Sequence, residues 1–332
     1  MEKRSRRKKK RRLRWKRVVL LSFFALFILG GLFAYNIYGD VASAVDKMTT
    51  TLDREKSDKR EEVIEFDEKD PVSILLVGVD EREDDAGRTD SMLVLTINPE
   101  LNSTKIVSIP RDTRAELVDK SDSKRDRVDK MNHAYAYGGI EMTMDSIENF
   151  LNIPLDYYVQ VNMQGFEDIV DAVDGIDVYN EYAFELDGTY LSKGEHHLNG
   201  EEALQYARMR KEDPNGDFGR QERQREVISK VIQKGASFST LTNYDEVLEA
   251  LSDNIKTNLT MQEIIGMQKS YRTAADNIEK MQIEGTNDYT NGVYYYMVED
   301  ETRQQLSDQL REHLGLETQE LRASKANTEF NG

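Results

Sequence analysis

The sequence predicts an α/β protein, with one layered α/β/α domain around a central mixed sheet and a single transmembrane helix before it. From residue 71 onward, short apolar runs bounded by turn residues alternate with segments of helical periodicity, which is typical of a layered α/β domain. The chain has 332 residues, 38% of them hydrophobic, which is enough for a sizeable core. Residues 18–38 contain no charged residue, which indicates the membrane helix.

The individual elements follow from local composition. Strands are expected where short apolar runs end at turn residues, at 73–79, 91–98, 105–109, 157–161, 176–179, 281–283 and 293–297. Helices are expected where apolar residues recur every three or four positions, at 138–151, 166–173, 200–207, 219–234, 244–256, 260–275 and 300–313. We see no internal repeat, so residues 71–316 are predicted to form one domain.

The N-terminal region predicts a single-pass protein of the cell membrane. As a helix rising about 1.5 Å per residue, residues 18–38 would reach roughly 30 Å, the thickness of a bilayer core. Residues 1–17 hold twelve Lys and Arg, so the positive-inside rule predicts a cytoplasmic tail and an extracellular body. The sequence Ala42-Ser43-Ala44 suits signal-peptide cleavage, but the apolar run exceeds the usual length of about 7–15 residues, which favours an uncleaved anchor.

The charge distribution excludes several classes of protein. The net charge is −17, and because residues 1–17 carry +11 the remainder carries −28. An acidic body argues against nucleic acid as a partner, since binding to phosphates needs a basic face. The absence of cysteine excludes a disulfide scaffold and a thiol nucleophile. The charged residues 39–70 are predicted to be an extracellular spacer, and the polar residues 317–332 a disordered tail.

A first candidate motif is V-G-V-D-E-R-E-D-D-A-G-R-T-D, residues 77–90. Asp80 follows the end of a predicted strand and Asp90 precedes the next, at an edge where open α/β sheets bind ligands. Two carboxylates there are ligands suited to Mg²⁺, or Mn²⁺ in its place, which also accepts substrate phosphates. Arg82 and Arg88 in the same loop fit a metal–phosphate site, although acids in a loop are often simply solvated.

A second motif, S-I-P-R-D-T, places Arg111 just beyond the strand predicted at 105–109. Its planar guanidinium can grip phosphate oxygens with two hydrogen bonds, or it can pair with the neighbouring Asp112. The sequence leaves both interpretations open.

The densest motif is Y-A-R-M-R-K-E-D-P-N-G-D-F-G-R-Q-E-R-Q-R, residues 206–225. Arg208 and Arg210 lie two apart, so both can face one pocket if the chain leaves the helix there and extends. Three polar residues share a face of the following helix, namely Arg220, Arg223 and Gln224. A basic amphipathic surface is the alternative, but arginines gathered within a body of −28 favour an anionic partner.

Together with K-M-N-H-A-Y and D-A-V-D-G-I-D-V, these motifs resemble those of the LytR–CpsA–Psr family, in the same order, over about residues 75–316. The chain is most similar to Gram-positive members associated with wall teichoic acid attachment. The resemblance implies a phosphotransferase that moves an anionic glycopolymer from a polyprenyl-pyrophosphate carrier to peptidoglycan.

The resemblance also implies residue roles. It implies that Asp80 and Asp90 contact magnesium, and that the two acids and Arg111 are catalytic. The pyrophosphate contacts that it implies are Arg88, Arg111, Arg208, Arg210 and Arg220, with Gln224 at the head group. Arg82 and Arg223 fit the motifs without an assigned role.

Some questions stay open at this point. The acceptor hydroxyl needs a base, and Asp80, Asp90 and Asp112 are equal candidates. One alternative function is a hydrolase of the polyprenyl pyrophosphate, and another is a non-catalytic, regulatory binder of wall lipids. A pure anion binder gains nothing from paired acids beside its arginines unless a metal bridges them, which argues against the binder. Arg303, in the final helix, is expected to be an exposed arginine outside the site.

Overall fold

The computed structural model describes residues 39–54, 56–79, 89–237 and 251–328. The chain divides into two compact units, Met1–Ser43 and Ala44–Gly332, and the strands, helices and cores discussed below belong to the second. Among the residues that the structure describes, none belongs to a helix with the length and apolar character needed to cross a bilayer. The anchor predicted at 18–38 lies outside the described residues.

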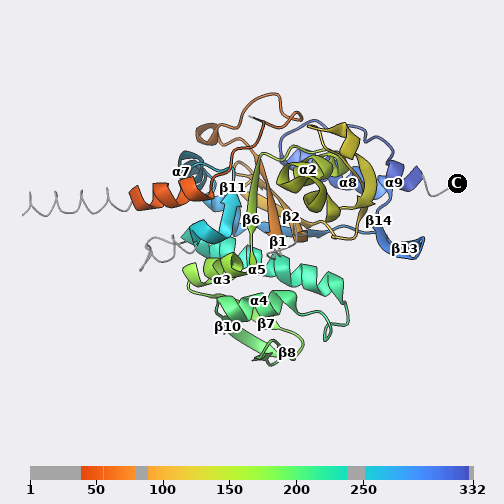
Figure 1. Ribbon diagram of the computed structural model, residues 1–332. Helices are drawn as coiled ribbons and strands as arrows, with labels where there is room; N and C mark the ends of the chain where they lie inside the picture. Colours follow the sequence, from red (N-terminus) through yellow and green to blue (C-terminus); the bar gives the residue numbers. More distant parts are fainter. Residues whose placement is uncertain (1–38, 55, 80–88, 238–250, 329–332) are drawn as a thin grey trace, which may run out of the picture. The chain divides into compact units, whose positions relative to one another are not determined.

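The centre of the domain is a six-stranded mixed sheet (Figure 1). Its strands, in spatial order, are β11 (Ile255–Thr257), β6 (Tyr157–Val161), β1 (Val72–Val79), β2 (Thr89–Asn98), β3 (Ser103–Ser108) and β12 (Ile278–Gln282). The β1–β6 and β3–β12 pairs are parallel, and the other three pairs are antiparallel. The predicted mixed sheet is therefore confirmed.

Both faces of this sheet are buried. Along β1, Leu75, Val77 and Val79 enter one core, whereas Val72 and Ile74 enter the other, as the alternation of side chains along a strand requires. Side chains of α2 (His133–Leu151) and α8 (Asp300–His313) fill the first core, and those of α5 (Asp217–Ser237) and α7 (Met261–Ser270) pack on the second. The sheet thus lies between two helical layers, as predicted.

A smaller core lies beside the main sheet. It is built by α3 (Met163–Ala172), α4 (Gly200–Arg208), the β7–β10 pair (Ile176–Asn180 and Gly194–Leu198) and the β8–β9 pair (Phe184–Leu186 and Thr189–Leu191). Figure 1 shows these elements together in green. Two further hairpins are β4–β5 (Arg114–Leu117 and Arg127–Lys130) and β13–β14 (Thr286–Thr290 and Val293–Met297). Short 3₁₀ turns are η1 (Phe66–Glu68), η2 (Ser123–Arg125) and η3 (Arg272–Asp276), and a last helical turn is α9 (Lys325–Thr328).

Two predicted helices end differently in the structure. The prediction of a helix at 244–256 is wrong at its C-terminal end, because Ile255–Thr257 pairs with β6 as the edge strand β11. The helix expected at 260–275 ends at Ser270 and continues as η3. Strands of three residues carry too little alternation to be detected in a sequence, so β8, β9 and β11 were not predicted.

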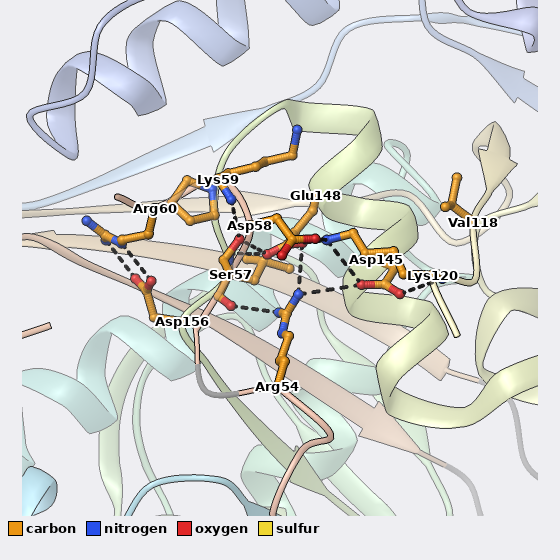
Figure 2. A network of polar contacts seen from close by, with 12 residues as sticks. Arg54, Ser57, Asp58, Lys59, Arg60, Val118, Lys120, Asp145, Glu148 and Asp156 are labelled. Atoms are coloured by element: carbon orange, nitrogen blue, oxygen red, sulfur yellow. Dashed lines mark hydrogen bonds and ion pairs between the residues drawn. The ribbon is translucent and has the colours of Figure 1, made fainter. Parts of the chain in front are cut away.

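The segment predicted as a spacer is bound to the domain by a buried ionic network (Figure 2). Glu148 of α2 is fully buried and accepts hydrogen bonds from Arg54 Nη1 at 2.9 Å, Lys120 Nζ at 2.9 Å and Ser57 Oγ at 2.6 Å. Although burial opposes it, the charge of Arg54 and these hydrogen bonds lower the pKa of Glu148. Arg54 and Ser57 are therefore held on the surface of the domain.

Arg303 differs from its prediction. The side chain is 4% exposed, and its guanidinium donates to the Phe150 carbonyl and pairs with Asp300 at 2.7 Å. The prediction of an exposed arginine was wrong, because a face of α8 that looks polar in sequence packs on the end of α2. The structure also folds residues Lys325–Thr328, in the predicted tail, as a helical turn with Ala326 buried.

Candidate active site

Two of the predicted site residues, Asp90 and Arg111, meet at one end of β2 and β3. Leu93 pairs with Ser108 in the antiparallel ladder, and continuing that register brings Asp90 opposite Arg111. Arg111 Nη1 donates to Asp90 Oδ1 at 3.0 Å, and its Nε lies 3.5 Å from Asp112 Oδ2. The side chain of Asp90 is 51% exposed, so this acid faces solvent beside the arginine. Asp80, Arg82 and Arg88 lie outside the described residues.

Arg220 joins this pair from the first turn of α5. Its side chain is only 13% exposed, and Nη2 lies 2.6 Å from Asp217 Oδ1. Its Nε is buried and has no hydrogen-bond partner among the described residues. Burial lowers the pKa of Arg220, and the nearby charges of Arg111 and Arg210 lower it further. The structure thus places Arg111 and Arg210 within electrostatic reach of Arg220, and a bound anion would relieve the repulsion among these three guanidinium groups.

The acids of the site balance these arginines only in part. Burial opposes the charge of Arg111, but the carboxylates of Asp112, Asp90 and Asp217 outweigh it and raise the pKa of Arg111. Asp112 also pairs with Lys130, whose Nζ lies 2.7 Å from Oδ1. Among the residues that the structure describes, Asp112 therefore pairs with two cations, whereas Asp90 has a single ion pair and a half-exposed carboxylate.

The connection between α4 and α5 is shaped by a buried arginine clamp. Arg223 donates to the carbonyls of Tyr206 and Met209 and pairs with Asp213, all within the protein interior. A Cβ on Gly219 would lie 1.8 Å from a carboxylate oxygen of Asp213, so only glycine fits there. Arg223 is therefore a structural residue that fixes the path of the chain before α5.

Arg208 and Arg210 separate in the structure. The helix α4 ends at Arg208, and Met209 is extended and buried, so the chain does leave the helix as predicted. Arg210 is exposed and lies within electrostatic reach of Arg220. Arg208 instead pairs with Asp187 at 2.9 Å. Gln224, one turn after Arg220, is half-buried and makes no hydrogen bond within the described part of the chain.

Three residues of the site were not predicted from the sequence. Lys130 belongs to the K-M-N-H motif and Asp217 to D-F-G, so both stood in motifs without an assigned role. Arg225 is buried on the next turn of α5 and donates to Ser108 Oγ at 2.9 Å, at the end of β3. Its bond ties α5 to the strand end from which Arg111 emerges.

The residues described here fit a magnesium ion in part. No group of three Asp, Glu or His side chains forms a metal cluster within the described ranges. Mg²⁺ needs only one or two protein carboxylates when substrate phosphates and water complete its shell, and the exposed carboxylate of Asp90 suits that role. The second predicted acid, Asp80, lies outside the described residues.

This arrangement defines a class of protein, an α/β domain with arginines and an aspartate gathered where two strands and a helix begin or end. The chain belongs to the LytR_cpsA_psr family, whose model matches residues 35–312. It is 47% identical over 310 residues to the polyisoprenyl-teichoic acid–peptidoglycan teichoic acid transferase TagU of Bacillus mycoides, covering 93% of this chain and 99% of that one.

Solved structures agree with this assignment. The fold is similar to that of TagT bound to LIIa-WTA, with a TM-score of 0.68 and 33% identity over 80% of this chain and all of that one. It is also similar to B. subtilis TagU, with a TM-score of 0.58 and 42% identity over 74% of this chain and 97% of that one. An Enterococcus faecalis protein described as a transcriptional regulator has a TM-score of 0.70 and 37% identity over 77% of this chain and 92% of that one.

Proposed function

We propose that this protein is a membrane-anchored phosphotransferase, which moves an anionic, teichoic acid-like glycopolymer from a polyprenyl-pyrophosphate carrier to peptidoglycan. The observation that carries the proposal is the ion pair of Arg111 with Asp90, together with the nearly buried Arg220, which lies within electrostatic reach of Arg111, Arg210 and Asp90. The names of the relatives, which describe teichoic acid transfer to peptidoglycan, supply the substrate classes.

The arginines suit the chemistry of a pyrophosphate. The acceptor hydroxyl attacks the phosphorus that carries the polymer, the bridging P–O bond breaks, and polyprenyl phosphate leaves with the bonding electrons. Negative charge grows on the leaving phosphate, and guanidinium groups that are already in place stabilise it without reorganisation. Arg220 is suited to this role, because its buried Nε has no hydrogen-bond partner in the described part of the chain.

The hydroxyl proton needs an acceptor. Among the described candidates, Asp112 is held by Lys130 and Arg111, whereas Asp90 is more exposed and has one partner. These contacts favour Asp90 over Asp112 as a base, and Asp80 remains a third candidate. Mg²⁺ or Mn²⁺, held by Asp90 and Asp80, would supply further positive charge to the phosphate oxygens.

The proposal includes the predicted topology. The basic residues 1–17 and the apolar residues 18–38 support a cytoplasmic N-terminus and an anchor in the cell membrane. The active domain is then extracellular, on the side of the membrane where peptidoglycan lies.

The test combines the purified full-length protein in detergent with a lipid-linked donor and peptidoglycan. A transferase joins polymer to the wall and releases polyprenyl phosphate in equal amount. Polyprenyl phosphate without wall-bound polymer would identify a hydrolase. Donor binding without any product would support a regulator, the role named for the Enterococcus faecalis relative.

A further inference from the structure

A row of tyrosines extends from the arginine cluster to the surface. Tyr296 of β14 is buried, and its ring centroid lies 5.6 Å from that of Phe218, the second residue of α5. Two positions before it, Tyr294 points to the same face of the hairpin. The ring of Tyr294 meets that of Tyr289 of β13 at 5.6 Å, and Tyr289 is 69% exposed.

The row is attached to the site at its buried end. Asp217, which pairs with Arg220, directly precedes Phe218. The backbone N–H of Tyr296 donates to the carbonyl of Asp112 at 2.9 Å. Burial raises the pKa of Tyr294, and the charges of Asp112 and Asp217 raise it further, so this ring lies within electrostatic reach of the site. Figure 1 shows the β13–β14 hairpin projecting beyond the main sheet.

We propose that the outer part of the tyrosine row, Tyr289 and Tyr294, is the acceptor subsite and binds the N-acetylhexosamine rings of a glycan strand, while the buried Tyr296 anchors the row to the domain. This inference rests on the proposed function, because it assigns a binding place to the acceptor of the proposed transfer. The faces of a pyranose carry C–H groups, which pack well on the electron-rich face of a tyrosine ring. Asn287 lies beside the row, where its Oδ1 accepts from the Tyr294 hydroxyl at 2.9 Å, and its amide supplies polar contacts next to the rings.

The charges of the hairpin favour this neutral glycan over the anionic donor polymer. Residues 286–297 contain one acid, Asp288, and no Lys or Arg. Arg114 lies about 5.8 Å from the ring of Tyr295, which points to the opposite face from the row. Lys130 Nζ lies 5.7 Å from the ring of Tyr295 and 5.8 Å from that of Tyr294, but it already pairs with Asp112 at 2.7 Å. A polyphosphate chain on the tyrosine row would therefore meet no cation from the hairpin itself, and the nearby Lys130 already has a carboxylate partner.

The test measures glycan binding and transfer separately. Chitotetraose, a neutral N-acetylhexosamine oligomer, is titrated into the full-length protein by calorimetry, and polyprenyl pyrophosphate is titrated in parallel. Tyr289→Ala and Tyr294→Ala should each weaken chitotetraose binding about fivefold or more, the loss typical of truncating an aromatic contact residue. Tyr289→Phe should bind normally because it keeps the ring. Tyr179→Ala is the matched control, since Tyr179 is 50% exposed on β7 in a different sheet.

In the transfer assay, Tyr289→Ala should raise the KM for peptidoglycan and leave the affinity for polyprenyl pyrophosphate unchanged. If the parent transfers no polymer but binds chitotetraose through Tyr289, the subsite stands and the transferase proposal fails. If the parent transfers polymer and both alanine variants keep its acceptor KM and glycan affinity, the subsite is refuted. Weaker binding of poly(glycerol phosphate) in these variants, with chitotetraose unaffected, would also overturn it by assigning the row to the donor.

Discussion

Replacing Arg220 tests the anion site most directly, because binding and stability should change in opposite directions. Arg220 is nearly buried, and its charge is opposed by desolvation and by Arg111 and Arg210. A charged group whose pKa is lowered in the folded protein costs stability until an anion arrives. We therefore expect Arg220→Ala to leave the Tm unchanged or raise it, although the contact with Asp217 is lost.

Donor binding should weaken strongly in the same variant. A hydrogen bond to a charged group contributes about 1.5–3 kcal/mol, which corresponds to a loss of about 10- to 150-fold in affinity. Arg220→Lys should recover part of this loss, because lysine keeps the charge but lacks the planar fork and the Nε donor. Arg272→Ala is the control, since Arg272 is an exposed arginine on η3.

The measurements are a thermal unfolding curve without ligand and a titration with polyprenyl pyrophosphate. Unchanged affinity in Arg220→Ala would refute the anion site. A Tm that falls by several degrees while affinity stays at the parent value would make Arg220 an ordinary structural arginine.

Four further predictions follow from other contacts. Asp90→Asn should fold normally and reduce turnover at least about 100-fold. EDTA should abolish the activity of the parent protein, and full activity in EDTA would refute a metal requirement. Asp187→Ala should tighten donor binding severalfold if Arg208 leaves Asp187 for phosphate, and an unchanged affinity would keep Arg208 outside the site. Glu148→Gln should lower the free energy of unfolding, measured in urea, by about 3–5 kcal/mol, because Arg54 and Lys120 lose a buried carboxylate partner. A reporter fused after residue 40 should be active only outside the cytoplasm, and cytoplasmic activity would contradict the topology.

The stabilisation from Glu148 should also depend on pH. Its folded-state pKa lies below the ordinary value of 4.5, so the unfolded protein takes up a proton first as the solution becomes acidic. The contribution is complete above about pH 4.5 and is lost as the pH falls through the lower, folded pKa. When urea unfolding at pH 4 is compared with that at pH 7, the free energy of unfolding should therefore decrease more for the parent than for Glu148→Gln.

The sequence predicted the sheet well because its strands are buried on both faces. Continuous apolar runs such as those around Leu75 and Val94 have no other explanation, and they gave β1 and β2 nearly complete. Of the β4–β5 and β13–β14 hairpins only β14 was predicted, and the other three strands were missed for the opposite reason. In β13 and β4, strands of four or five residues carry mixed polar side chains, and their partners are fixed by tertiary contacts such as the bond from Tyr296 to Asp112.

At the site, too, the sequence indicates which residue types are present but not which partners they contact. The clustering of Arg in residues 206–225 indicated an anion, but it did not separate Arg220 from Arg223, which lie on one face of the same helix. In the structure, every nitrogen of the Arg223 guanidinium donates to a carbonyl or to Asp213, and the side chain is buried, so Arg223 serves the protein interior. Arg303 is also buried against a carbonyl and a carboxylate. Within the ranges that the structure describes, the buried Nε of Arg220 has no partner, and a native protein tolerates such a group at a cost of about 1–3 kcal/mol. A bound phosphate would remove that cost, because its oxygens accept what the protein leaves unpaired, and this is why Arg220, rather than Arg223, should bind the donor.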